Sequence, residues 1–168
     1  QKSYAYEDRA LRIGYGQTIS QPSLVGRMID YLEPTANHTI LDIGTGSGYQ
    51  AAILSKIVKR VISVERIEEL RVNATKLITK ILKLENINIY PTRKILGWPN
   101  NAPYDGIIVG AAAQTIPTIL VNQLAIGKRM VVPVGSSSQQ NIYVIIRSVN
   151  GFEIQKKESV RFVPLIID

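Results

Sequence analysis

The sequence predicts an α/β protein whose sheet is mostly parallel, carries helices on both faces and ends in an antiparallel edge. The first observation is the alternation of short apolar runs with segments of helical periodicity through residues 22–124. The second is the series of strand-like segments and short turns after residue 128. The third is the glycine-rich stretch 39–48, which joins a strand to a helix as in nucleotide-binding βαβ units.

The first part of the chain has no regular hydrophobic period. Residues 1–20 are rich in tyrosine, glycine and charge, so we expect a loop that lies beside a binding site. Pro22 suits the first turn of a helix, where its missing N–H costs little. Apolar residues recur on one face of this helix as far as Leu32, and Glu33 and Pro34 end it.

The stretch 39–48 is the centre of the predicted binding site. A short buried strand is followed by Gly44, Gly46 and Gly48, and an amphipathic helix begins at Tyr49. Glycines let the backbone turn sharply and come close to a ligand without a Cβ in the way. A glycine turn that joins a strand to a helix without any ligand is the alternative.

Glu65 adds a second signal for a nucleoside ligand. It ends the next strand, about twenty residues after Gly44, where a carboxylate can accept hydrogen bonds from a ribose diol. The glycine pattern lacks both the further glycine of the dinucleotide fingerprint and the Lys-Ser/Thr ending of a phosphate-binding loop. Adenosine without a polyphosphate fits better, so the predicted cofactor is S-adenosylmethionine.

The remaining elements follow from apolar runs, periodicity and turn residues. We expect helices over 67–83 and 116–124, the second stopped by Gly127. The expected strands are 39–42, 60–64, 87–90, 105–109, 129–134, 142–147 and 160–166. Ligands of parallel sheets lie beyond the carboxyl ends of the strands. The segments expected to gather there are 44–48, 65, 92–94 and 110–114.

Composition limits the possible chemistry and partners. The 168 residues are 45% hydrophobic, which suffices for the core of one domain. With no cysteine and only His38, neither a metal site nor thiol catalysis is expected. The net charge of +7 favours acidic partners, but it is spread along the chain, so no nucleic-acid partner is expected. Neither a membrane span nor a signal peptide is predicted.

A set of motifs runs in order over nearly the whole chain. The stretches are Tyr6-Glu-Asp8, Gly14-Tyr-Gly-Gln-Thr-Ile-Ser-Gln-Pro22, Leu41-Asp-Ile-Gly-Thr-Gly-Ser-Gly-Tyr-Gln50, Val64-Glu-Arg66, Leu96-Gly-Trp-Pro99, Tyr104-Asp-Gly-Ile-Ile-Val109, Val131-Val-Pro-Val-Gly135 and Val160-Arg-Phe-Val-Pro-Leu165. The stretches 17–22 and 161–165 are the most specific of them. Together these motifs resemble the protein-L-isoaspartate O-methyltransferase family.

The resemblance implies a class I S-adenosylmethionine-dependent methyltransferase fold in a single domain over 1–168. Its expected parts are an N-terminal loop over 1–20, a cofactor-binding core over 21–135 and C-terminal strands over 136–168. The implied reaction is methyl transfer to the α-carboxylate of L-isoaspartyl residues in damaged proteins. The ester then closes to a succinimide, whose hydrolysis regenerates some aspartate. Because members of the family are mostly cytosolic and often monomeric, we expect a cytoplasmic monomer that acts on isoaspartyl proteins or peptides.

The resemblance also assigns candidate site residues. Ser20 is the catalytic hydroxyl, placed to hydrogen-bond the substrate carboxylate, and starting the following helix is its alternative role. The substrate-binding residues are Ile19, Val163 and Pro164. The cofactor-binding residues are Thr18, Gly44, Thr45, Gly46, Ser47, Gly48, Glu65, Arg93 and Lys94. A carboxylate nucleophile and a sulfonium donor need no further activation, so catalysis would come mainly from in-line positioning and the exclusion of water.

The sequence departs from the family pattern in three places. The family's helices ahead of Tyr4 are missing, and Tyr15 replaces a usual histidine. Thr92-Arg93-Lys94 stands where the family has Gly-Asp-Gly, whose aspartate holds the adenine amino group. We expect Arg93 to turn toward solvent while its stem covers the adenine; the alternative is a rebuilt segment that leaves the adenine pocket partly open. The alternatives to a repair methyltransferase are a degenerate binding protein without catalysis and an RNA methyltransferase. Only the net charge of the chain favours the RNA methyltransferase.

Overall fold

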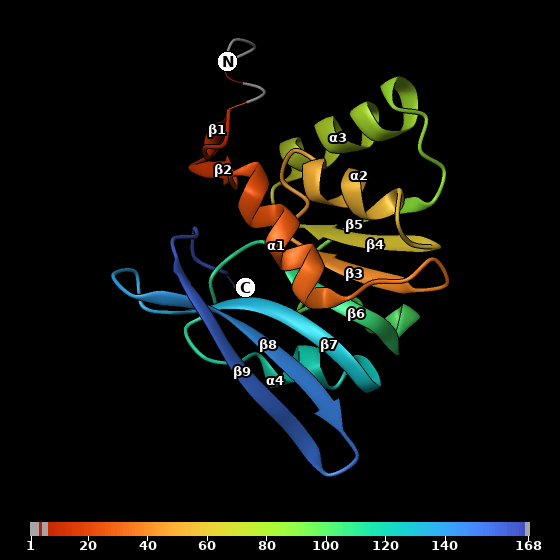
Figure 1. Ribbon diagram of the computed structural model, residues 1–168. Coiled ribbons are helices and arrows are strands. Elements are labelled where there is room, and N and C mark those ends of the chain that lie inside the picture. The colour runs from red at the N-terminus through yellow and green to blue at the C-terminus, as the bar shows by residue number, and fades with distance from the viewer. Residues whose placement is uncertain (1–3, 5–6, 167–168) are drawn as a thin grey trace.

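The computed structural model describes residues 4 and 7–166 and is built on one seven-stranded sheet (Figure 1). The strands lie side by side in the order β5-β4-β3-β6-β7-β8-β9. They are β3 Thr39–Ile43, β4 Arg60–Glu65, β5 Ile87–Pro91, β6 Tyr104–Val109, β7 Leu124–Gly135, β8 Gln140–Ser148 and β9 Gly151–Val160. Parts of the expected N-terminal loop (1–3, 5 and 6, hence Tyr6 of the first motif) and the last two residues lie outside the described residues.

Strands β3 to β7 form the parallel part of the sheet, as the alternation of strand and helix predicted. Asp42 of β3 pairs with Ser63 of β4, and Ile43 pairs with Val109 of β6. This part of the sheet is covered on both faces, which accounts for the continuous apolar runs of its strands. The register brings the ends of β3, β4 and β6 to one edge.

Helices pack on both faces of the sheet (Figure 1). They are α1 Pro22–Leu32, α2 Tyr49–Ser55, α3 Glu68–Lys76 and α4 Thr118–Val121. The apolar stripes of α1 and α2 belong to one core, and α4 belongs to the other core with Leu96 and Trp98. Within the part of the chain that is described, no helix is both long and apolar enough to cross a membrane.

Two of the expected helices have different bounds. The helix expected over 67–83 is α-helical only to Lys76 and continues as the π-helical segment Leu77–Ile81, in which Ile78 is buried and Ile81 is exposed. The helix expected over 116–124 shrinks to α4, because Leu124 pairs with Tyr104 and begins β7. Gly127 consequently lies inside β7 and does not stop a helix.

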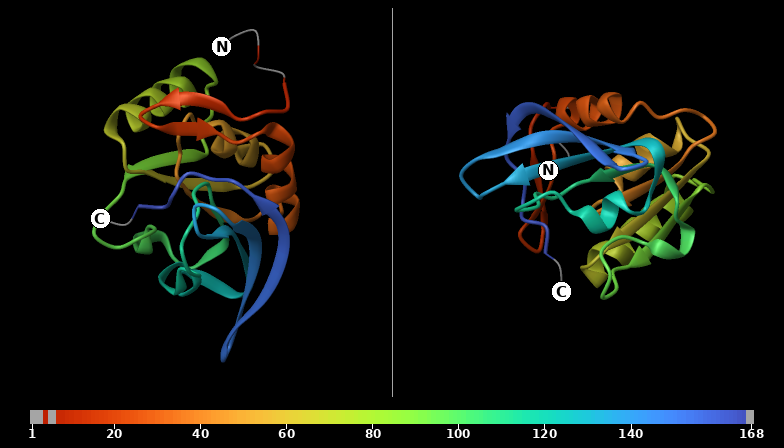
Figure 2. Two further views of the ribbon diagram at one scale, coloured as in Figure 1. Left: turned by 90° about the vertical axis from the view of Figure 1, so that its left-hand side faces the viewer. Right: turned by 90° about the horizontal axis from the view of Figure 1, so that it is seen from below.

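The antiparallel edge is made by β7, β8 and β9, and the β8–β9 hairpin projects beyond the rest of the sheet (Figure 2). The prediction of a strand over 160–166 was wrong, since β9 ends at Val160. Pro164 has no N–H to give to a ladder. The side chain of Gln140 takes the place of a strand partner: Phe162 N–H donates to its Oε1 at 2.7 Å.

The N-terminal segment is more regular than expected. Residues Leu11–Gly14 and Gln17–Ile19 form the antiparallel strands β1 and β2, where a loop was predicted. Tyr15 and Gly16 connect them with φ values of 53° and 71°. Positive φ at both central residues is the geometry of a tight hairpin turn. The hairpin leads directly into α1.

Candidate cofactor and substrate site

The turn between β3 and α2 forms a backbone cradle. Gly44, Gly46 and Gly48 have φ values of 89°, 54° and 86°, a region that residues with a Cβ rarely adopt. The N–H groups of Gly44 and Thr45 both donate to the carbonyl of Val64, at 2.9 and 3.1 Å, which fixes the turn against β4. A Cβ at Gly44 would meet no atom within 4 Å, so the cradle is open to a ligand there.

Glu65 lies at the end of β4 and is only 7% exposed. Its Oε2 accepts the backbone N–H of Gly46 at 2.8 Å, and its Oε1 accepts the N–H of Ile67 at 2.8 Å. A carboxylate oxygen can accept more than one hydrogen bond, so both oxygens keep capacity for a ligand. Two acceptors fixed in this way suit the two hydroxyls of a ribose.

A cavity opens beside the turn, beyond the ends of β3, β4 and β6. Apolar side chains from distant segments enclose it, including Ile13 of the hairpin, Leu96 and Leu165. The predicted site residues that line it are Thr18, Gly44, Gly46, Glu65, Val163 and Pro164. The C-terminal segment is held there by backbone bonds, since Ala112 N–H donates to the Val163 carbonyl at 2.8 Å.

A second hollow adjoins this cavity. Its lining contains Thr18, Gly44 and Gly46, which the two hollows share. It also contains four other predicted residues: Ile19, Ser20, Thr45 and Ser47. The remaining glycine, Gly48, is not part of either lining and starts α2 as its N-cap.

The start of α1 leaves the hydroxyl of Ser20 available. The N-cap position is held by Gln21, which makes no capping hydrogen bond through its side chain. Asp8 caps the helix instead, from 15 residues earlier in the sequence: its Oδ1 accepts the backbone N–H of Ser23 at 2.8 Å. This bond lowers the pKa of the Asp8 carboxyl.

A buried polar network supports the glycine turn from beneath, and the sequence interpretation missed it. The carboxylate of Asp42 is fully buried and accepts hydrogen bonds from Ser63 Oγ at 2.6 Å and Gln50 Nε2 at 2.7 Å. Thr45 Oγ1 lies 2.5 Å from Ser63 Oγ, and because Ser63 gives its proton to Asp42, Thr45 is the donor of this bond. Burial raises the pKa of Asp42 to about 6, against the lowering effect of these donors. A charged residue inside an apolar strand was the available signal.

The structure does not bring Arg93 and Lys94 to the cavity. Thr92 lines it, whereas both basic residues line a separate hollow with Trp98. The Arg93 guanidinium carbon lies 4.3 Å from the centroid of the Trp98 ring, in cation–π geometry. The ring of Tyr90 also stacks on this indole, with 4.2 Å between the two ring centroids. A role of Arg93 at the adenine remains a prediction.

Comparison with known proteins agrees with this arrangement. The profile of the protein-L-isoaspartate(D-aspartate) O-methyltransferase family matches residues 1–168. The chain belongs to this family. A protein-L-isoaspartate O-methyltransferase of Aliivibrio salmonicida is 49% identical over 162 residues, which are 96% of this chain and 77% of that protein. Protein-L-isoaspartate O-methyltransferase 2 of Nitrosococcus oceani is 45% identical over 98% of this chain and 75% of its own.

Solved structures of isoaspartate methyltransferases share the fold. One superposes with a TM-score of 0.88 at 27% identity over 98% of this chain, which spans 55% of the length of that protein. A putative family member from Plasmodium falciparum, in complex with S-adenosyl-L-homocysteine, superposes with a TM-score of 0.78 at 27% identity. The match covers 97% of this chain and 82% of that protein. The class I methyltransferase fold and the family expected from the motifs are thereby confirmed.

Proposed function

We propose that this isoaspartate methyltransferase transfers the methyl group of S-adenosylmethionine to the α-carboxylate of L-isoaspartyl residues in damaged proteins. The observation that carries the proposal is the bond between Glu65 and Gly46, which prepares a nucleoside site in a chain of this family. Ser20 lies in the adjoining hollow, where a substrate carboxylate can approach. The site thus offers two connected places, one for each reactant.

The residues present fit the cofactor. Glu65 offers two acceptor oxygens to the ribose, and the open backbone at Gly44 admits the rest of the nucleoside. When bound, the cofactor would supply an electrophilic methyl group on a sulfonium, with a neutral thioether as the leaving group. The substrate carboxylate forms the new oxygen–carbon bond as the carbon–sulfur bond breaks, so no proton has to be moved.

The chain's own contribution to the reaction is positional. Ser20 donates its hydroxyl to one oxygen of the substrate carboxylate and orients the other toward the methyl group. Val163, Pro164 and Ile13 exclude water from the place where the two reactants meet. Ile19, beside Ser20 in the second hollow, contacts the isoaspartyl side chain.

The proposal extends to the setting in which the enzyme acts. As the family resemblance implies, it works as a monomer in the cytoplasm on isoaspartyl proteins and peptides. Sedimentation velocity across a range of concentrations tests the first point, and a concentration-dependent shift to a faster species would contradict it.

Methyl transfer to a matched pair of peptides tests the activity. The two peptides have one sequence and differ only in an L-isoaspartyl or an ordinary aspartyl residue. With labelled S-adenosylmethionine, we expect base-labile label on the isoaspartyl peptide alone. Equal labelling of both peptides, or labelling of a structured RNA instead, would contradict the proposal. Cofactor binding without any transfer would favour a degenerate binding protein.

A further inference from the structure

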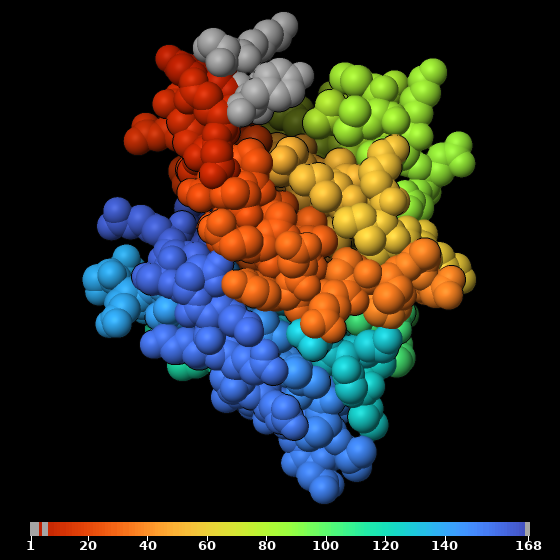
Figure 3. Space-filling view, in the orientation of Figure 1, coloured from red at the N-terminus to blue at the C-terminus, as the bar shows by residue number. Residues whose placement is uncertain are grey.

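A groove runs outward from Ser20 between the start of α1 and the end of β9, which lie side by side on one face of the molecule (Figure 3). Its volume is about 550 Å³. Thr18 and Ser20 line both this groove and the hollow described above, and Val163 joins it to the cofactor cavity. A chain that places a carboxylate at Ser20 can therefore continue along the groove.

Arg161 is presented in this groove on a fixed backbone. The next residue, Phe162, makes two backbone hydrogen bonds with the buried side chain of Gln140. Its N–H donates to Gln140 Oε1 at 2.7 Å, and its carbonyl accepts from Gln140 Nε2 at 3.3 Å. The carbonyl of Val163 is held in turn by Ala112. The position of Arg161 relative to Ser20 is thus set by the fold although it lies outside any strand.

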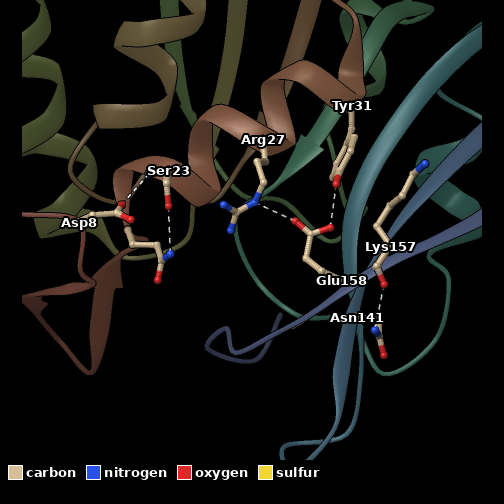
Figure 4. A network of polar contacts seen from close by, with 8 residues as sticks. Asp8, Ser23, Arg27, Tyr31, Asn141, Lys157 and Glu158 are labelled. Atoms are coloured by element: carbon tan, nitrogen blue, oxygen red, sulfur yellow. Dashed lines mark hydrogen bonds and ion pairs between the residues drawn. The ribbon is translucent and has the colours of Figure 1, made fainter.

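Of the two charged side chains along the groove, one has an acidic partner within the described part of the chain and the other has none. Arg27 and Arg161 are the charged residues of the lining, and both are basic. Arg27 Nε donates to Glu158 Oε1 at 2.9 Å, while Tyr31 donates its hydroxyl to the other oxygen of that carboxylate at 2.8 Å (Figure 4). Among the described residues, Arg161 has no hydrogen bond or ion pair, and its side chain is exposed. An uncompensated cation at the wall of a groove attracts an anionic ligand group.

We propose that the groove holds the peptide segment flanking the isoaspartyl residue and that Arg161 pairs with an acidic side chain in that segment. This rests on the proposed function and adds a sequence preference to it. The guanidinium offers a planar fork that matches a carboxylate, so Arg161 selects Asp or Glu in the flank over Asn or Gln. Because the pair is exposed to solvent, the preference is modest, about twofold to fivefold in affinity.

The test compares two isoaspartyl peptides that differ at one flanking position, where one has Glu and the other Gln. The position is moved through each of the three residues on either side of the isoaspartyl residue. Affinity is measured by fluorescence anisotropy in saturating S-adenosylhomocysteine, and methylation of both peptides is followed separately. We expect the Glu peptide to bind about twofold to fivefold more tightly at one or two positions, and less so in high salt.

Variants assign the preference to Arg161. Arg161→Gln should bind both peptides equally, and Arg161→Lys should retain part of the preference because it keeps the charge. Lys59→Gln is the matched control, since it removes one exposed charge from the turn before β4, at the opposite end of that strand from Glu65. It should leave the preference unchanged. Circular dichroism confirms that each variant is folded.

The outcomes separate this inference from the proposed function. Methylation of the Gln peptide by the unmodified chain reports on the function alone. Equal affinity for the Glu and Gln peptides at every position overturns the inference while the enzyme stays active. If Arg161→Gln weakens both peptides by the same factor, Arg161 binds the isoaspartyl α-carboxylate instead, which also overturns it. Binding of neither peptide overturns both proposals.

Discussion

The carboxylate of Glu65 accepts the backbone N–H of Gly46 at 2.8 Å, and this bond ties the end of β4 to the glycine turn after β3. The other oxygen is fixed by the N–H of Ile67, so the carboxylate is oriented before any ligand arrives. Such preorganisation reduces the cost of ordering the site when the cofactor binds. The first prediction follows from it.

Glu65→Ala should weaken binding of S-adenosylhomocysteine by at least about tenfold, because two hydrogen bonds to a charged group are each worth about 1.5 kcal/mol or more. Calorimetric titration measures the dissociation constant. Glu85→Ala is the control, since it removes an exposed carboxylate outside the cavity lining and should leave the constant unchanged. An unaltered constant in Glu65→Ala would reject the ribose-binding role.

Ser20→Ala should lower kcat for an isoaspartyl peptide by about tenfold or more while S-adenosylhomocysteine binds as before. The reason is that, under the proposed function, the Ser20 hydroxyl contacts the substrate carboxylate and not the cofactor. Ser23→Ala, on the same helix start, should retain normal turnover. Steady-state kinetics and thermal melting together decide between the two roles of Ser20. Normal kinetics with a lower Tm would make it a helix-start residue.

Asp42 should make stability depend on pH. Burial raises its folded-state pKa from 3.8 to about 6, so folded Asp42 holds a proton more tightly than the unfolded chain does. Its contribution to stability is therefore present below about pH 4 and is lost as pH rises through about 6. The free energy of unfolding should fall by as much as about 3 kcal/mol from this residue across that interval.

Urea unfolding at a series of pH values measures this loss. Asp42→Asn should flatten the fall, since the amide keeps the shape but cannot ionise, and Asp42→Ala should destabilise the chain because it leaves Gln50 and Ser63 without their acceptor. Asp30→Asn, an exposed control, should follow the unmodified chain. The same pH dependence in Asp42→Asn and in the unmodified chain would contradict the assignment.

The parts of the fold that local spacing determines were predictable from the sequence. The strand before Gly44, the turn and the position of Glu65 depend on residues close in the chain, and the structure places them as expected. Pairing between distant residues decided the rest. Leu124 joined β7 because Tyr104 lies beside it, and Phe162 left the sheet because Gln140 holds it. No local pattern in the sequence contains such contacts.

The candidate site likewise contains residues that the sequence could indicate and contacts that only the folded chain shows. Thr18 and Val163 could be assigned through the family resemblance, and the fold brings both to the cavity. Asp42 stands out in the sequence as a charged residue in an apolar strand, but its cluster with Ser63 and Thr45 joins two strands and the turn. These partners are visible only once the register of β3 and β4 is known. The contact of Arg93 with Trp98 likewise depends on how the segment between them folds back.

Replacing Thr92, Arg93 and Lys94 with Gly-Asp-Gly should tighten S-adenosylhomocysteine binding by up to about tenfold, because an aspartate can accept a hydrogen bond from the adenine amino group. The Arg93→Ala variant is the control: it removes the contact with Trp98 without adding an acceptor, so it should not tighten binding. Titration of both variants checks the expectation. Unchanged or weaker binding in the triple variant would show that this segment does not reach the adenine.

Tandem mass spectrometry of an isoaspartyl peptide, after incubation with the chain and S-adenosylmethionine, locates the transferred methyl group. We expect one methyl ester, located on the α-carboxylate of the isoaspartyl residue, followed by conversion of that residue to a succinimide. The Ser20→Ala reaction should show far less ester under the same conditions. A methyl group on any other atom, or none on a peptide that a known isoaspartate methyltransferase modifies, would contradict the proposed function.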